Sequence, residues 1–159
     1  MTGGETEEWV PAGALAWHYR WEAETCFKAG AHVATILMSQ LAFEELLRAY
    51  CRSALGHGGK LSDGTPVFTS GFSDLIREAE NGGLLSPNEA AELHELRSLR
   101  NPYVHTRDKP SKPDDWSDQM LKIEAPELLG VGVEDEARRA IRLLRALWPT
   151  LARRQWGLE

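Results

Sequence analysis

The stretch from residue 31 to residue 55 constrains the fold more than any other part of this sequence. It reads AHVATILMSQLAFEELLRAYCRSAL and is followed by GHGG. Its side chains recur at spacings of three and four residues, which is the period of an α-helix. The row consists of Val33, Ile36, Leu37, Gln40, Leu41, Glu44, Leu47 and Tyr50. Because most of this helix is apolar and glycines follow it, we predict a helix over about 31–55 that runs through the middle of a bundle.

Two further helices are predicted on either side of a loop. The segment VPAGALAWHYRWEAETCFKAG, with Pro11 suited to a first helical turn, predicts a helix over about 11–29. Glycine, proline and serine indicate a loop over about 56–71. The segment FSDLIREAENGGLLS then predicts a short helix with Ser73 as its cap and the glycines after Asn81 as its end.

The second half of the chain predicts two more helices and a long connection. Ser86, Pro87 and Glu89 form a capping-box pattern, so a helix should begin near residue 87. The region 106–132 is rich in proline and aspartate and reads as a connection, with one short helix expected near 116–121. The segment VEDEARRAIRLLRALWPTLARRQWG predicts the last helix, because acids begin it and arginines end it.

Composition limits the fold and the function classes. No strand pattern competes with the helices, so we expect one all-α domain over 1–159, a bundle of about five helices. Two cysteines, Cys26 and Cys51, are too few for a disulfide framework, and no stretch is apolar enough for a membrane span, so we expect a cytoplasmic protein without membrane contact. The histidines show no metal-ligand spacing, so we predict no metal and no cofactor. A net charge of −6 argues against a broad duplex-binding surface but leaves RNA open.

The segment LRSLRNPYVHTRD brings an arginine and a histidine together around a proline. On a straight helix Arg100 and His105 would lie roughly 140° apart around the axis. Pro102 disfavours helical geometry at Asn101, so the helix should end or kink there, which could bring the two side chains toward one surface.

An arginine and a histidine on one surface suit phosphoryl chemistry without a metal. Histidine exchanges protons near neutral pH, and arginine binds phosphate oxygens through its planar fork. RNA cleavage needs a proton removed from the 2'-hydroxyl, a proton given to the leaving 5'-oxygen and positive charge on the phosphorane. Because arginine, asparagine and histidine are also common at ordinary helix ends, the spacing alone leaves a plain helix terminus as the alternative.

Arg100-Asn101-Pro102-Tyr103-Val104-His105, preceded by Leu96 and Leu99, resembles the R-x4-6-H motif of the HEPN superfamily (higher eukaryotes and prokaryotes nucleotide-binding), in which asparagine commonly follows the arginine. The long helix with LMSQLAFEELLRAY, the segment FSDLIREAENGGLLS and a closing helix also follow the order of that superfamily. The resemblance covers about residues 30–150 and implies an up-and-down bundle of four or five helices.

The resemblance also implies an activity and partners. Many members are dimeric, metal-independent endoribonucleases of toxin or defence systems that leave a 2',3'-cyclic phosphate, while others are inactive scaffolds. Carried over to this chain, Arg100 would contact the scissile phosphate, His105 would act as general acid or base, and Asn101 would orient the pair or the phosphate. Expected partners are RNA, a second copy of the chain and a cognate antitoxin or nucleotidyltransferase-like protein. Members silenced by such a transferase tend to carry tyrosine two residues after the histidine, where this chain has Arg107.

Other residues carry weaker expectations. Glu44 and Glu45 interrupt the apolar helix; one should pair with a nearby arginine, and the alternative is that Glu44 positions Arg100 or His105. Arg97 and Arg107 flank the motif and are candidate RNA contacts. The arginines of the last helix are expected to form a solvated face, and the tryptophans near both termini suggest that the first and last helices pack together or form a dimer face.

The sequence therefore leaves three interpretations open. The first is a metal-independent ribonuclease with a site shared by two chains. The second is a non-catalytic HEPN-like scaffold that binds nucleotide or protein. The third is a helical interaction domain in which the motif has no role, and its Arg100 and His105 would lie on opposite faces.

Overall fold

The fold is known from a computed structural model, which describes residues 13–53, 59–104 and 132–158, with the backbone alone for 100–104. This part of the chain contains five α-helices and one 3-10 turn and no strand, only an isolated bridge between Lys60 and Pro66. The elements are α1 (Ala14–Lys28), α2 (His32–Ser53), η1 (Val67–Thr69), α3 (Phe72–Asn81), α4 (Pro87–Val104) and α7 (Val133–Gln155). The expected all-α bundle is confirmed. The short helix expected near 116–121 lies outside the described residues.

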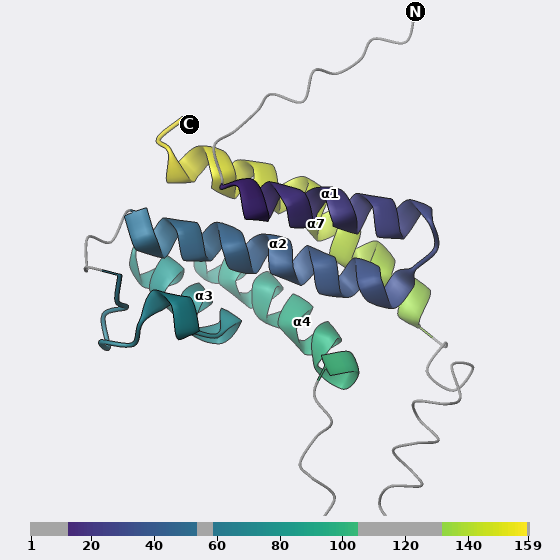
Figure 1. The fold of residues 1–159 in the computed structure, drawn as a ribbon, viewed down its shortest axis with the longest axis horizontal. Helices are drawn as coiled ribbons and strands as arrows, with labels where there is room; N and C mark the ends of the chain where they lie inside the picture. The colour runs from purple at the N-terminus through teal and green to yellow at the C-terminus, as the bar shows by residue number, and fades with distance from the viewer. Residues whose placement is uncertain (1–12, 54–58, 105–131, 159) are drawn as a thin grey trace, which may run out of the picture.

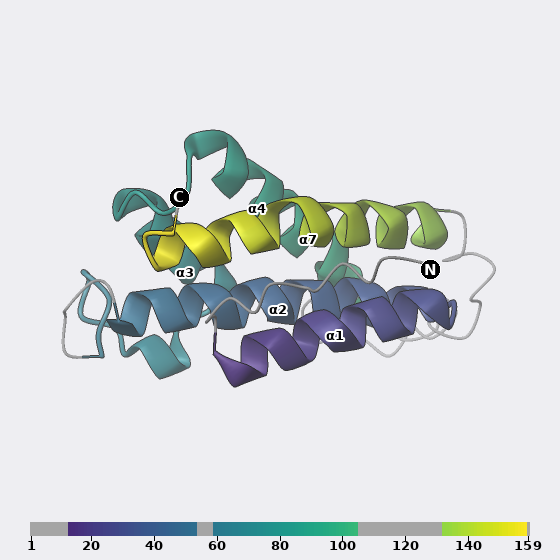
Figure 2. The same cartoon turned by 90° about the horizontal axis from the view of Figure 1, so that it is seen from above.

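The helices are arranged around α2. Figure 1 shows α1 and α7 along one side of α2 and α3 and α4 along the other. In Figure 2 α1, α2 and α7 run nearly along one direction, while α4 crosses them obliquely. Contacts agree with this picture, because α2 packs against α1, α3, α4, α7 and η1. The prediction that the apolar helix runs through the middle of the bundle is correct.

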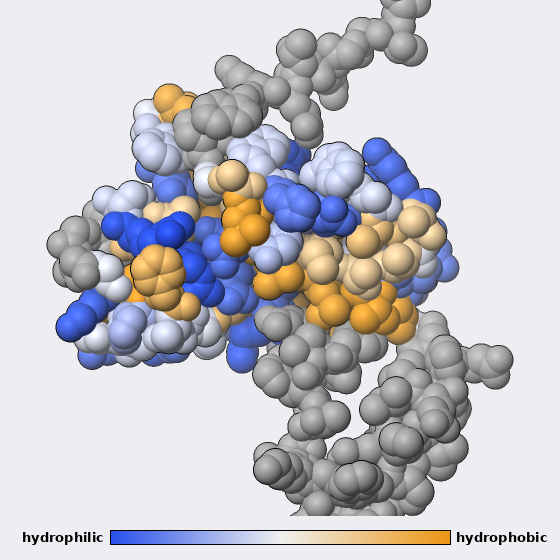
Figure 3. Space-filling model, in the orientation of Figure 1, coloured by the Kyte–Doolittle hydropathy of each residue, from blue (hydrophilic) through white to orange (hydrophobic). Residues whose placement is uncertain are grey.

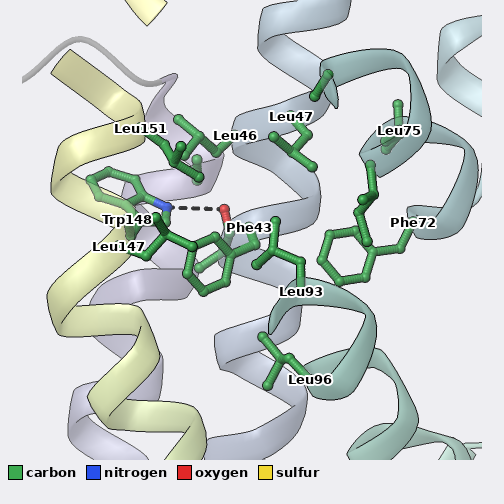
Figure 4. Close-up of a cluster of buried hydrophobic side chains, with 14 of the residues drawn as sticks. Phe43, Leu46, Leu47, Phe72, Leu75, Leu93, Leu96, Leu147, Trp148 and Leu151 are labelled. Atoms are coloured by element: carbon green, nitrogen blue, oxygen red, sulfur yellow. Dashed lines mark hydrogen bonds between the residues drawn. The ribbon is translucent and has the colours of Figure 1, made fainter. Parts of the chain in front are cut away.

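The core lies where α2, α4 and α7 meet. Figure 4 shows Phe43 of α2 beside Leu93 of α4, with Trp148 of α7 across from them. Trp148 is fully buried, and its indole Nε1 donates a hydrogen bond of 3.1 Å to the carbonyl oxygen of Ala42. A buried tryptophan needs such an acceptor, so the pairing of α7 with α2 has one defined geometry.

One end of α2 is less covered than its middle. Figure 3 shows apolar surface over the end of the bundle where α1 and α2 join. Val33 of α2 is 37% exposed there, and Leu37 and Leu41 of the same row are only partly buried. In the part of the chain that the structure describes, α2 is therefore central along its second half and partly open along its first.

The first and last helices pack together, as the tryptophan pattern suggests. Trp17 of α1 meets Trp148 edge to face, with ring centroids 4.8 Å apart, and the guanidinium of Arg20 lies 5.0 Å from both ring centroids. Arg145 of α7 donates two hydrogen bonds, of 2.8 and 2.7 Å, to the carboxylate of Glu24. These bonds, more than the partial burial, hold the pKa of Glu24 below its ordinary value. Helices α1 and α7 are thus joined by an aromatic contact and by a bidentate ion pair.

The arginines of α7 pair mostly within the bundle. Arg138 pairs with Glu134 of the same helix, and Arg139 donates a 3.0 Å bond to Glu95 of α4. With Arg145 on Glu24 as well, most of this charge is already matched. The exposure and the pairing of these arginines agree with the solvated face that the sequence predicts.

The helix starts confirm one cap and correct another. The backbone N–H of Ser86 donates to Glu89 at 2.7 Å and that of Glu89 donates to Ser86 Oγ at 3.3 Å, so the predicted capping box begins α4. Ser73 does not cap α3. That helix begins at Phe72, with Gly71 in the cap position and no side-chain cap. The phenylalanine ring is buried in the core, and this places Phe72 in the first turn.

We expect Glu89→Gln to lower the free energy of unfolding by about 1 kcal/mol at pH 7 and by less at pH 3. Burial raises the pKa of Glu89, but hydrogen bonds from Arg154 and from the Ser86 backbone, with the charge of Arg154, outweigh burial and lower the pKa below 4.5. A lowered folded pKa means that the ionised carboxylate stabilises the fold above pH 4.5 and that this stability is lost as pH falls through the folded pKa. Urea unfolding of both proteins at the two pH values measures the difference. An equal difference at both would contradict the assignment.

Candidate functional site

The motif helix is α4, and it extends further than predicted. It continues through Asn101 and Pro102 and ends at Val104, so the expectation that the helix ends at Asn101 is wrong. A proline removes one backbone donor and crowds the carbonyl four residues earlier, and here only two helical residues follow it. The alternative expectation, that the helix kinks at this proline, stays a prediction.

The two ends of the motif differ in what the structure describes. Arg100 and Asn101 belong to α4 by their backbone. His105 and Arg107 lie outside the described residues. Whether Arg100, Asn101 and His105 converge therefore stays a prediction.

Arg97 lies one turn before the motif and is half-buried. Its Nε is shielded from solvent and has no hydrogen-bond acceptor among the described residues. An arginine nitrogen without a partner is costly at a buried position, so an incoming acceptor would be favourable here. The role of Arg97 as an RNA contact stays a prediction.

Glu44 and Glu45 both pair with Arg48, as the simpler expectation had it. Arg48 Nη2 donates to Glu44 at 2.7 Å, and its Nε donates to Glu45 at 3.1 Å. The side chains of Arg48 and Glu44 are 10% and 15% exposed, so the pair is largely desolvated. The alternative, that Glu44 also positions Arg100 or His105, stays a prediction, because the described side chains of α4 end at Leu99.

Arg48 has a structural role that sequence reasoning missed. Its Nη1 donates to the carbonyl oxygens of Val67, Phe68 and Ser70 at 2.6, 3.3 and 3.2 Å. One guanidinium thus fixes η1 and the turn after it onto α2. The usable signal was an arginine three and four residues after two glutamates in an apolar row, because a buried carboxylate pair needs a cation.

Gln40 belongs to the row of side chains that predicts α2, and the structure shows a further property of it. It is 1% exposed, and its Oε1 is buried without a hydrogen-bond partner among the described residues. Its neighbour Ser39 is fully buried, and its Oγ also lacks one. Buried polar groups are normally paired. The middle of α2 therefore carries polar atoms that the apolar core does not satisfy.

The described residues contain neither a cluster of metal-ligating side chains nor a membrane-spanning helix. Within 13–53, 59–104 and 132–158, no three His, Cys, Asp or Glu side chains gather as a metal ion would require. Among the described helices, none has the length and apolar character needed to cross a membrane. No protein-family model, no curated protein and no solved structure matches this chain. The family resemblance thus rests on the motif and on the order of the helices.

Proposed function

We propose that this chain is a metal-independent endoribonuclease of HEPN type, with a site shared by two copies of the chain. One observation carries the proposal: the residues Arg100 to Val104 form the last turn of α4 within an all-helical bundle, and His105 follows directly in the sequence. Such a bundle presents the motif at the end of a helix that is well fixed by the core below it.

The proposed reaction is an internal transesterification of RNA. The 2'-oxygen attacks phosphorus as it loses its proton to one imidazole, the bond from phosphorus to the 5'-oxygen breaks, and the 5'-oxygen takes a proton. The products are a 2',3'-cyclic phosphate and a 5'-hydroxyl end. Arg100 stabilises the charge on the phosphorane, His105 transfers protons, and Asn101 orients the pair or the phosphate.

Two copies of the chain supply what one copy lacks. A single His105 cannot act as base and acid at once, whereas two copies offer one imidazole for each proton transfer. Arg97 and Arg107 would contact RNA on either side of the motif, and Glu44 would support Arg100 from α2. A cognate antitoxin or a nucleotidyltransferase-like protein in the cytoplasm would control such an enzyme.

We expect purified protein to cleave RNA in excess chelator and to lose cleavage by a factor of about 100 or more in His105→Ala and in Arg100→Ala. Single-stranded and structured RNA are incubated with each protein, and the 3' ends of the products are analysed for a cyclic phosphate. His94→Ala is the matched control, because His94 belongs to the same helix but not to the motif. It should cleave as the wild type does.

Two outcomes would overturn the proposal. Cleavage that survives in both motif variants would come from another site or from a contaminant. If no protein cleaves while the wild type binds RNA and Arg100→Ala binds it less well, the non-catalytic scaffold is the correct function.

A further inference from the structure

A groove of about 550 Å³ runs between α4 and α7. Its floor is apolar and includes Leu96 and Leu99 of α4 and Leu143 and Leu147 of α7. Leu96 and Leu147 are buried at its base, while Leu99 and Leu143 are only partly covered. The groove lies along the same helix whose last turn carries the motif.

The two edges of this groove have opposite charge. The α4 edge is acidic, with Glu89, Glu92 and Glu95, and the α7 edge is basic, with Arg139 and Arg142. Glu95 and Arg139 pair across the groove at 3.0 Å. Glu92 and Arg142 are exposed, and neither forms an ion pair with any side chain of 13–53, 59–104 or 132–158. Two unmatched charges of opposite sign therefore lie on opposite edges of an apolar floor.

We propose that a second copy of this chain covers the groove, with Glu92 of each copy paired to Arg142 of the other. A two-fold axis parallel to the groove places the α4 edge of one copy over the α7 edge of the other, so that acid faces base on both sides. An axis across the groove would place α4 over α4 and bring like charges together, which is unfavourable. The charges thus select one of the two symmetric arrangements.

The helix register agrees with this pairing. Glu89 pairs with Arg154 and Glu95 pairs with Arg139, so residue numbers rise along α4 as they fall along α7. Glu92 lies one turn before Glu95, and Arg142 lies one turn after Arg139. The offset between Glu92 and Arg142 along the groove is therefore the same as that between Glu95 and Arg139, which form an ion pair. An axis parallel to the groove preserves this offset, so Glu92 faces Arg142 of the second copy with the displacement along the groove that Glu95 and Arg139 have within one copy.

This arrangement deepens the proposed function and rests on it for its catalytic meaning. The same axis keeps the carboxyl ends of both α4 helices at one end of the dimer. The two copies of Arg100 and Asn101 then belong to one end of the assembly, as a shared site requires. The interface itself follows from the groove and its charges, and it can be tested without RNA.

The test is sedimentation equilibrium of the full chain, carrying Glu92→Arg, Arg142→Glu or both substitutions. The wild type should form a dimer of twice the 17.8 kDa chain mass. Each single substitution creates two like-charge contacts per dimer and should raise the dimer Kd by about tenfold or more, and the double substitution should restore it. Asp135→Arg is the matched control: it is an exposed charge reversal on α7 away from the groove and should leave the Kd unchanged. Circular dichroism verifies that each variant is folded.

Three results would overturn the interface: a wild type that is monomeric at roughly 100 μM, single variants with an unchanged Kd, or a double variant that stays monomeric. Failure of the ribonuclease proposal gives a different result. A dimer that responds to the charge exchange but cleaves no RNA overturns the activity alone, whereas a monomer that cleaves RNA overturns the interface alone.

Discussion

Replacing Arg48 by alanine is expected to lower the free energy of unfolding by about 3 kcal/mol. This is a larger loss than the one expected for Glu89→Gln. The substitution of Arg48 leaves Glu44 and Glu45 without their shared cation. It also removes the Arg48 donor from the carbonyl oxygens of Val67 and Ser70, and Val67 retains only the 3.3 Å bond from the backbone N–H of Ser70. These groups are mostly shielded from solvent, so water replaces the lost bonds only in part.

Urea unfolding followed by circular dichroism measures this loss, and hydrogen exchange locates it. Amides of the 59–71 segment should lose protection in Arg48→Ala more than those of α7, because Arg48 fixes η1 onto α2. Arg52→Ala is the control one turn further along α2. Arg52 is exposed and its guanidinium lies 5.4 Å from the ring centroid of Phe68, so this substitution should cost less than about 1 kcal/mol. Equal losses in the two variants would show that the Arg48 bonds do not stabilise the fold.

Trp148→Ala should lower the free energy of unfolding by about 4 kcal/mol. The substitution leaves a cavity where α1, α2 and α7 meet and removes the edge-to-face contact with Trp17 and the hydrogen bond to Ala42. Trp148→Phe retains most of the apolar volume and removes the indole donor, so it should cost about half as much.

Urea unfolding followed by the helical circular dichroism signal compares these variants, because tryptophan fluorescence changes with the substitution itself. Trp21→Ala is the matched control: Trp21 belongs to α1 but is 63% exposed, so its loss should change stability by less than about 0.5 kcal/mol. If Trp148→Ala were no more harmful than Trp21→Ala, the central position of Trp148 in the core would be wrong.

The fold was predictable because its helices carry strong local signals. The apolar row that includes Ile36 and Leu47 predicted α2 and its central place, and Ser86 with Glu89 predicted the start of α4 to within one residue. Ser73 was misassigned because a cap preference of about 1 kcal/mol is smaller than the gain from burying Phe72, which only the tertiary structure reveals.

The candidate site was predictable only in part. The residue types Arg100 and His105 predict phosphoryl chemistry, but their spacing does not predict that the two side chains meet, because that depends on the chain beyond Val104. Local rules placed the end of α4 at Asn101, before Pro102, whereas the helix continues to Val104. Arg48 was missed because its acceptors, the carbonyls of Val67 to Ser70, lie about 20 residues away along the chain, and no local pattern connects a side chain with a distant backbone turn. The sequence likewise does not predict that Glu92 and Arg142 line one groove, because this depends on α4 and α7 lying side by side.

The contacts of α7 have a consequence for the order of folding. The bonds from Arg145 to Glu24 and from Trp148 to Ala42 join residues 121 and 106 positions apart, whereas α1 and α2 are joined by a short turn. On a ribosome the α1–α2 hairpin can form early. The apolar face that the hairpin packs against α7 stays uncovered until this last helix has been synthesised. A chain interrupted before residue 148 would expose that face to chaperones and proteases, so the groove between α4 and α7, proposed above as the dimer surface, would form only in chains that have completed α7.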